Sequence, residues 1–421
     1  MKHQRTVLPP RTDLRSRRKR VAARVMVRGL DLGERLLSRM LVEVTPPADD
    51  PFYRVPENLE AFCPGEVLAS RPVEVRGFRR PVSADAWQVK FRSTDTHGAA
   101  VSGVTTVMIP RRPFSGPVRP MLSYQPAIDS LGAGADPSFT LRQGNQKELP
   151  FMIWALRRGW GVVATDYTGP RHAFAAGLVA ARFVLDGIRA ALAFEPAGFD
   201  AATPIGLWGY SGGGQATVSA AEQHPSYAPE LNIVGAAAGG VPVDEGSWPR
   251  MFDDDYLFSG QSLACCIGIS REFPDVDLHG ALTPQGQALV AAAAEMTVEQ
   301  LWLSFPFLHW GDYLTVPSWF EIPGMRAVAN RLGEATPTTS MYLYHAVHDQ
   351  FPAIADVDEL VEKYRREGVD VTYRRFRFGE HFIVAFTAVP SSLRFLSERF
   401  GIPVSRRRRE RRHPEELEPL R

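Results

Sequence analysis

The chain has 421 residues, of which 44% are hydrophobic and 23% charged, and this is the ordinary balance of a globular enzyme. Its net charge of +1 hides an uneven distribution, because residues 1–40 hold 12 Lys and Arg against 3 Asp and Glu, and residues 406–421 hold 7 against 4. Residues 41–405 therefore carry a net charge of −11, which argues against nucleic-acid binding by the folded part and leaves two basic arms that could contact an anionic membrane.

The N-terminal arm, residues 1–49, contains one strongly periodic stretch. Over residues 20–44, charged residues recur at three- and four-residue steps on one face, and aliphatic residues do the same on another. This pattern predicts an amphipathic helix. Two interpretations stay open, since such a helix could pack on the protein core or lie on a membrane surface through its arginine-rich face.

Charged residues in this arm interrupt every apolar stretch that could serve as a secretory signal, and no run of 18 or more apolar residues occurs in the chain. We therefore expect a cytoplasmic or cell-associated protein without a transmembrane helix. The C-terminal tail, residues 401–421, is rich in arginine, and like charges at this density predict disorder.

Between the arms, apolar strand-like runs alternate with helix-like runs. This alternation predicts an α/β fold, with a mostly parallel sheet covered by helices on both faces. The predicted strands cover residues 101–109, 119–124, 161–165, 205–208, 233–238, 341–345 and 371–378. The predicted helices cover residues 148–158, 173–194, 215–224, 354–367 and 391–400.

One stretch, residues 244–340, breaks the alternation. It has no clear strand, is rich in aromatic residues and is far too long for a simple crossover connection. We interpret it as a helical cap inserted between residues 50–243 and 341–400, which would form the two parts of one α/β core.

The strongest local motif is Gly209-Tyr210-Ser211-Gly212-Gly213, which has the pattern G-x-S-x-G. It follows the predicted strand 205–208 and precedes the predicted helix 215–224, which is the context of a nucleophile elbow in an α/β-hydrolase fold. Side chains two residues from the serine would collide with neighbouring backbone where the chain reverses, so glycines are expected there. Ser211 is therefore the candidate nucleophile, with the N–H of Gly212 directed at a developing oxyanion.

A serine hydroxyl needs a base, and the base needs an acid that holds its tautomer. In this fold the chain order is serine, acid, histidine. Asp349 comes just after the predicted strand 341–345, and His381 follows the strand 371–378 in a glycine-containing loop. Nearby alternatives break the order or the position, because they precede the acid or fall within the next helix; these are His345, His348, Asp356 and Asp358.

The second oxyanion donor should come from the loop that starts at Ser123 and continues through Ser130. This loop is not of the HGGG type, and the spacing of its residues does not select one amide.

Several motifs spread over residues 50–400 resemble the secretory triacylglycerol lipases of the lipase-A type, a family of the α/β-hydrolase superfamily. They are Asp50-Pro51-Phe52-Tyr53, Pro64-Gly65-Glu66, Ser123-Tyr124-Gln125 followed by Asp129, Thr165-Asp166-Tyr167 with Gly169-Pro170, Leu185-Asp186-Gly187-Ile188-Arg189-Ala190, the Gly209–Gly213 elbow and the Asp349/His381 pair. The resemblance implies that Ser211, Asp349 and His381 form the catalytic triad, and that the backbone N–H groups of Asp129 and Gly212 form the oxyanion hole.

The expected activity is hydrolysis of lipid or other apolar carboxylic esters through an acyl-enzyme on Ser211, with no cofactor and no metal. The aromatics of the cap could form its own core, and some could also line a tunnel for an acyl chain. Alternatives are a carboxylesterase for short or soluble esters, a catalytically silent lipid-binding module and a peptidase of the same fold. The family's members are mostly secreted, so secretion is the alternative location.

Overall fold

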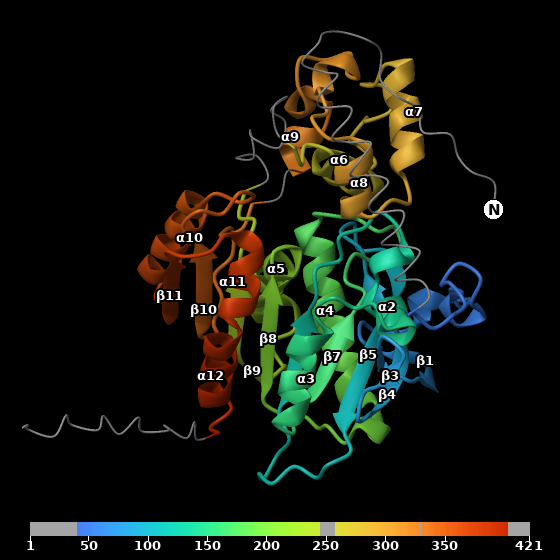
Figure 1. Ribbon diagram of the computed structural model, residues 1–421. Helices are drawn as coiled ribbons and strands as arrows, with labels where there is room; N and C mark the ends of the chain where they lie inside the picture. Colours follow the sequence, from blue (N-terminus) through green and yellow to red (C-terminus); the bar gives the residue numbers. More distant parts are fainter. Residues whose placement is uncertain (1–39, 245–256, 329–330, 403–421) are drawn as a thin grey trace, which may run out of the picture.

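The computed structural model describes residues 40–244, 257–328 and 331–402. Its centre is a nine-stranded sheet with the strand order β1-β4-β5-β7-β6-β8-β9-β10-β11 (Figure 1). The strands are β1 (Val67–Pro72), β4 (Ala84–Thr94), β5 (Ala100–Pro110), β6 (Met121–Gln125), β7 (Gly161–Thr165), β8 (Ile205–Tyr210), β9 (Ile233–Gly239), β10 (Met341–Ala346) and β11 (Val371–Phe376). Two short strands, β2 (Arg76–Gly77) and β3 (Arg80–Pro81), form a separate hairpin.

The α-helices in the described ranges are α2 (Pro137–Gln143), α3 (Leu149–Arg157), α4 (Gly177–Ala193), α5 (Gly212–Tyr227), α6 (Gln261–Glu272), α7 (Pro284–Ala293), α8 (Val298–Ser304), α9 (Met325–Val328), α10 (Ile354–Arg366), α11 (His381–Thr387) and α12 (Val389–Arg399). Every strand and helix predicted from the alternation is present, with ends that differ by a few residues.

The sheet is mostly parallel, as predicted. Five of its eight neighbouring pairs are parallel, and these join the strands from β7 to β11. The three pairs at the β1 edge are antiparallel. The sequence analysis missed β1 and β4, although β4 pairs with β5 along its whole length. In β4 the polar residues Gln88 and Lys90 are buried, which obscures the alternation that marks a strand.

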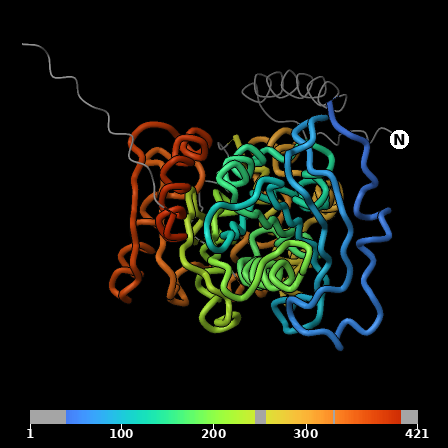
Figure 2. Tube along the Cα trace, turned by 90° about the horizontal axis from the view of Figure 1, so that it is seen from below, coloured from blue at the N-terminus to red at the C-terminus, as the bar shows by residue number. Residues whose placement is uncertain are grey.

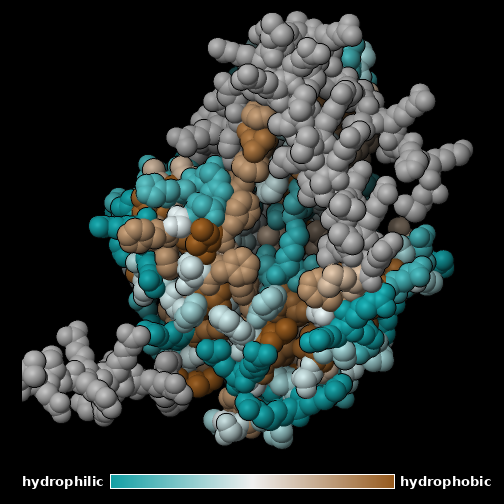
Figure 3. All heavy atoms as spheres, in the orientation of Figure 1, coloured by the Kyte–Doolittle hydropathy of each residue, from teal (hydrophilic) through white to brown (hydrophobic). Residues whose placement is uncertain are grey.

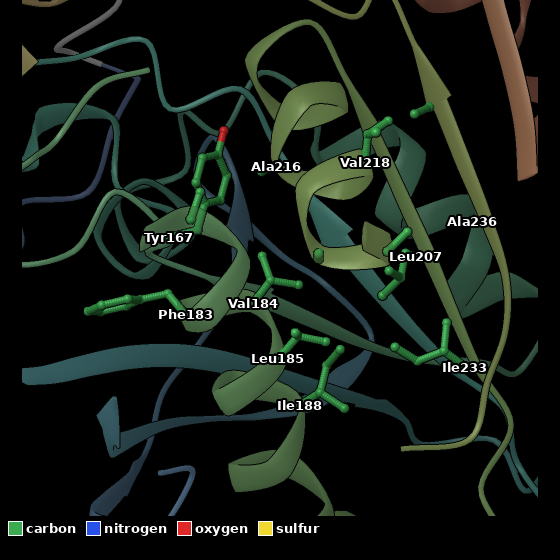
Figure 4. Close-up of a cluster of buried hydrophobic side chains, with 14 of the residues drawn as sticks. Tyr167, Phe183, Val184, Leu185, Ile188, Leu207, Ala216, Val218, Ile233 and Ala236 are labelled. Atoms are coloured by element: carbon green, nitrogen blue, oxygen red, sulfur yellow. The ribbon is translucent and has the colours of Figure 1, made fainter. Parts of the chain in front are cut away.

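Each face of the sheet has its own hydrophobic core. One core joins α4, α5 and α10 to the sheet and includes Leu185, Leu207 and Ile233 (Figure 4). The other joins α3, α11 and α12 to the opposite face and includes Trp208. Leu207 and Trp208 are neighbours on β8, so the side-chain alternation of one strand supplies both cores.

The region interpreted from the sequence as a cap contains α6, α7, α8 and α9 and has a third hydrophobic core. Figure 1 shows these helices above the edge of the sheet toward which the arrow of β8 points. Trp310 and Trp319 are buried in that core, and Trp302, Phe305 and Phe320 pack partly buried against it. The aromatic residues of this region therefore serve first to hold its helices together.

Seen from below, the N-terminal strands and the C-terminal helices lie on opposite sides of the molecule (Figure 2). The predicted amphipathic helix lies mostly outside the described residues, as does the basic C-terminal tail from residue 403. Residues 40–44, its predicted end, are not helical, and the N–H of Val42 donates to the carbonyl of Gln143, 3.0 Å away. None of the described helices is long and apolar enough to cross a bilayer.

Candidate active site

Ser211 lies at the turn between β8 and α5, where the motif predicted it. Its φ of 55° and ψ of −123° are unusual for a residue with a side chain. The N–H of Ser211 donates to the carbonyl of Gly239 on the neighbouring strand, 2.8 Å away, which holds the turn in place. The strained backbone raises the serine side chain above the carboxyl end of the sheet.

The glycines around Ser211 have the steric role expected from the sequence. A Cβ on Gly209 would come within 2.1 Å of the carbonyl oxygen of Gly213, and a Cβ on Gly213 within 1.9 Å of that of Gln125. Gly212 differs, because the nearest atoms to its Cβ position are 3.9 Å away, on Asp129 and Tyr167. Glycine is thus required at positions 209 and 213, two residues before and two residues after the serine. Gly212 faces open space beside Asp129.

Three predicted residues from different parts of the chain form one hydrogen-bonded relay. Nε2 of His381 lies 2.9 Å from Oγ of Ser211, and Nδ1 of His381 lies 2.8 Å from Oδ2 of Asp349. A carboxylate only accepts hydrogen bonds, so Nδ1 carries the proton and Nε2 is left to accept from the serine hydroxyl. The side chain of Asp349 is 1% exposed, so its charge interacts with the imidazole in a poorly solvated place.

Additional hydrogen bonds orient both partners of the serine. The N–H of Phe351 donates to Oδ1 of Asp349 at 2.9 Å, and the N–H of His381 donates to Oε1 of Gln350 at 3.2 Å. Gln350 in turn donates to Glu380, which caps the N-terminus of α11. The loop after β10 therefore fixes Asp349 and the start of the helix that begins with His381.

His345, set aside in the sequence analysis, lies close to the acid. Its Nε2 is 3.6 Å from Oδ2 of Asp349 but 3.1 Å from the carbonyl oxygen of Pro352. A carbonyl only accepts, so Nε2 of His345 is protonated and donates to Pro352. Burial lowers the pKa of His345, which keeps this ring neutral. It supports the loop that carries Asp349 and does not contact Ser211.

The loop predicted to supply the second oxyanion donor is held on the core side by Tyr167. The Tyr167 hydroxyl accepts from the N–H of Ile128 at 3.1 Å and donates to the carbonyl of Pro126 at 2.9 Å. This places Asp129 beside Gly212. Burial, together with the nearby Glu299 carboxylate, raises the pKa of the Asp129 carboxyl to about 7.

Comparison with known proteins agrees with the geometry of this site. A family model described as secretory lipase matches residues 139–404, which is more than half of the chain. The chain belongs to the secretory lipase family. This confirms the resemblance drawn from the motifs, and it makes the protein a carboxylic ester hydrolase with an α/β-hydrolase fold.

Individual relatives agree with the family assignment. A protein of Mycobacterium tuberculosis named a probable inactive lipase is 36% identical over 374 residues, covering 85% of this chain and 84% of the relative. Lipase A of Arthroderma benhamiae is 35% identical over 389 residues, covering 86% and 81%. The closed-state structure of Candida antarctica lipase A superposes with a TM-score of 0.76 at 28% identity, covering 86% of this chain and 89% of that one.

A cluster of aromatic rings connects the relay of this family member to the cap. The ring of Phe351 packs edge-on against His381 with centroids 5.0 Å apart, and Trp302 of α8 stacks on Phe351 at 5.6 Å and 17°. Phe258 and Phe382 contact the same two aromatic rings. Trp302 is therefore a cap residue that lies one ring away from the histidine.

Sequence reasoning assigned no role to three residues that support the relay or the loop of Asp129. Gln350, Glu380 and Tyr167 act through hydrogen bonds to residues 30 to 41 positions away, and no motif spacing signals such partners. Gln350 is next to Asp349 in the sequence and Glu380 is next to His381. This adjacency was the one sequence feature that could have indicated their supporting role. Within the described ranges, no group of three His, Cys, Asp or Glu side chains could hold a metal ion.

Proposed function

We propose that this chain hydrolyses apolar carboxylic esters, with Ser211 as nucleophile, His381 as general base and Asp349 as the orienting acid. The observation that carries the proposal is the continuous relay of two hydrogen bonds, 2.9 Å and 2.8 Å long, that joins these three side chains. Such a relay is the arrangement that activates a serine hydroxyl at neutral pH.

In the first step, Oγ of Ser211 attacks the ester carbonyl carbon while its proton passes to Nε2 of His381. The charged Asp349 stabilises the imidazolium, and the N–H groups of Gly212 and Asp129 donate to the oxyanion of the tetrahedral intermediate. Collapse of this intermediate transfers the proton from His381 to the leaving alcohol and leaves an acyl group on Ser211. A water molecule, deprotonated by His381, then attacks the carbonyl carbon of the acyl-enzyme. When this second tetrahedral intermediate collapses, the bond to Oγ of Ser211 breaks, the proton on His381 returns to Oγ, and the acid is released.

The surface around the base favours an apolar substrate presented at a lipid interface. Ten large hydrophobic residues are strongly exposed in the described ranges, and four lie within nine positions of one another. We call these four the α11 surface; they are Phe378, Phe382, Ile383 and Phe386. Figure 3 shows brown and tan residues below the cap, where Figure 1 places α11. An exposed apolar cluster of this kind marks an interaction site.

Positive charge flanks the same surface. Three arginines, Arg374, Arg375 and Arg377, are exposed on the segment that leads into Phe378. Arginine beside exposed aromatics is suited to the boundary between lipid head groups and acyl chains. We therefore include peripheral contact with a lipid surface in the proposal, through the α11 surface and the basic arms, and we propose no binding to nucleic acid.

The proposed division into a core of residues 50–243 and 341–400 with a cap of residues 244–340 gives Trp302 a role in substrate choice. A cap aromatic one ring away from His381 can contact an acyl chain, and each buried methylene stabilises binding by about 0.8 kcal/mol. A preference for short soluble esters is the alternative. The family description as secretory supports secretion, which was the alternative to a cytoplasmic or cell-associated location.

A substrate panel tests the proposal. Purified protein and its Ser211→Ala variant would be assayed on p-nitrophenyl esters from acetate to palmitate and labelled with a fluorophosphonate. We expect labelling that depends on Ser211, a rate that rises with chain length, and a loss of about 10⁴–10⁶ in turnover in the variant. A wild-type protein that neither labels nor hydrolyses any ester would instead be a silent lipid-binding module, and residual activity of a few per cent in Ser211→Ala would refute the nucleophile.

A further inference from the structure

The loop that carries Asp129 is hydrogen-bonded to the cap as well as to the core. The N–H of Leu131 donates to the carbonyl of Met296 at 3.0 Å, and the N–H of Val298 donates to the carbonyl of Asp129 at 2.9 Å. Between these bonds, Ser130 and Thr297 form an isolated antiparallel bridge. The backbone of the proposed oxyanion loop is thus paired with a segment of the cap, so its position depends on where that segment lies.

The cap side of this bridge is itself fixed. Thr297 is the N-cap of α8 and forms a complete capping box with Gln300, which ties the start of the helix to the bridging residues. The fit is tight, since a Cβ on Gly132 would come within 2.3 Å of the Glu295 carboxylate. The Glu295 carboxylate thus occupies the space beside Gly132, and the backbone of Glu295 lies 3.4 Å from the same position.

One arginine joins both halves of the bridge. Arg271, at the end of α6, donates from Nη1 to the carbonyl of Leu131 at 2.5 Å and from Nη2 to the carbonyl of Ala294 at 2.6 Å. Nη1 also lies 3.4 Å from the carbonyl of Arg171 in the core. The guanidinium therefore clamps the oxyanion loop and the cap segment together through their main-chain oxygens.

The residue next to Arg271 fixes the position of this clamp. Glu272 is 1% exposed, pairs with Arg171 at 2.8 Å and accepts from the N–H of Thr96 at 2.8 Å. The end of α6 is thereby anchored to the α/β core. Because Glu272 is held by the core and is adjacent to Arg271 in sequence, the backbone of Arg271 is held in place as well. Its side chain therefore reaches the loop from a fixed position.

We infer that Arg271 is a positioning residue for the oxyanion hole, and that the cap completes this hole by pairing with the loop that carries Asp129. The inference rests on the proposed role of the Asp129 N–H as an oxyanion donor. Donors of this kind stabilise the transition state only when they are held in place before the reaction, and displacements of about 1 Å are costly. Arg271 touches neither substrate nor reacting atoms and acts through the carbonyl of Leu131.

The test compares Arg271→Met and Arg271→Lys with Arg326→Met in the full-length chain. Arg326 is a matched control because it is also a cap arginine and pairs with the exposed Glu321. The measurements are kcat and KM on a soluble short-chain ester, which avoids any acyl-chain contact with the cap. Thermal unfolding and inhibition by an alkyl trifluoromethyl ketone, which forms a tetrahedral oxyanion adduct on Ser211, complete the set.

We expect Arg271→Met to lower kcat by about 10- to 100-fold with KM changed less than threefold, because one donor is displaced and not removed. Affinity for the trifluoromethyl ketone should fall by a similar factor, Arg271→Lys should recover part of both losses, and Arg326→Met should match wild type. Unchanged kcat in Arg271→Met, or an equal loss in Arg326→Met, would overturn the inference. If Arg271→Met does not fold, Arg271→Lys with wild-type kcat and inhibitor affinity overturns it equally. Failure of the proposed function is distinct, since wild type itself would then be inactive.

Discussion

The hydroxyl of Tyr210 donates a 2.6 Å hydrogen bond to the carbonyl oxygen of His381, so the residue before the proposed nucleophile holds the backbone of the proposed base. Tyr210 is buried, and its ring lies 5.0 Å from the imidazole. The turn that strains Ser211 and the helix that starts at His381 are therefore coupled by one side chain.

Tyr210→Phe removes the hydroxyl that bonds to the His381 carbonyl and keeps the aromatic ring, so it tests this hydrogen bond alone. The variant leaves the His381 carbonyl without its buried donor, which costs about 1–3 kcal/mol of stability. We expect a lower melting temperature and a kcat reduced several-fold with KM nearly unchanged, measured by calorimetry and by kinetics on a soluble ester. A variant with wild-type stability and kcat would show that this bond does not hold the base.

The two partners of Ser211 should differ in their importance for turnover. His381→Ala removes the group that transfers the proton, so its loss of kcat should approach that of Ser211→Ala. Asp349→Asn should be less damaging, because the acid orients the imidazole and does not take the proton. Steady-state kinetics of the three variants, with fold checked by circular dichroism, would contradict the assigned roles if Asp349→Asn proved the most severe.

The two glycines after Ser211 should respond in opposite ways to alanine. Gly213→Ala places a Cβ 1.9 Å from the Gln125 carbonyl oxygen, and backbone atoms must move to accept it. Gly212→Ala meets nothing nearer than 3.9 Å and keeps its N–H. We expect Gly213→Ala to lose most activity and several degrees of melting temperature, and Gly212→Ala to retain the fold. Equal tolerance of both changes would show that the elbow is less closely packed than described.

Phe378 is 90% exposed and should contribute to lipid contact without contributing to the core. Burial of a phenylalanine side chain in an apolar phase stabilises binding by about 1.5–3 kcal/mol. Phe378→Ser should therefore weaken sedimentation with anionic lipid vesicles about tenfold or more and lower activity on an emulsion, with soluble-ester kinetics unchanged. Val55→Ser is the control, because Val55 is 61% exposed and lies outside the α11 surface. An equal effect of the two changes would remove α11 from the proposed lipid contact.

Glu222, buried on α5, should make stability fall as pH rises. Burial raises the pKa of Glu222 to about 7, although its carboxylate accepts from the Gly333 N–H at 2.6 Å and from the Tyr364 hydroxyl. The folded protein keeps this proton between pH 4.5 and 7 while the unfolded chain loses it, so the free energy of unfolding decreases across that window.

Glu222→Gln keeps an acceptor for both donors and removes the charge. The stability of the variant relative to wild type should increase from pH 4 to pH 8, by up to about 3 kcal/mol. Urea unfolding at several pH values measures this difference. Glu222 lies about 16 Å along α5 from Ser211, so activity should not change. A stability difference that is flat with pH would mean that the Glu222 pKa is ordinary.

The sequence by itself determined the local structures and their order. The elbow at Ser211 could be predicted because a strand, a turn and a helix are encoded within a few consecutive residues, and the glycines report steric limits that act over two positions. The placement of Asp349 and His381 beside Ser211 could be predicted because the order of strands in this fold determines which strand ends lie next to the elbow. Family motifs then added Asp129, which spacing alone could not select.

Tertiary structure decided which distant residues contact one another, and local sequence patterns do not specify those contacts. The strand β4 buries Gln88 and Lys90 because residues elsewhere in the chain supply their partners: Gln88 donates to the carbonyl of Ser138, and Lys90 to that of Arg54. The clamp by Arg271 likewise joins a cap helix to a core loop 140 positions away. Hydrogen bonds between such distant residues depend on how the packed elements are arranged in space. The periodicity and spacing of residues along the chain do not determine that arrangement.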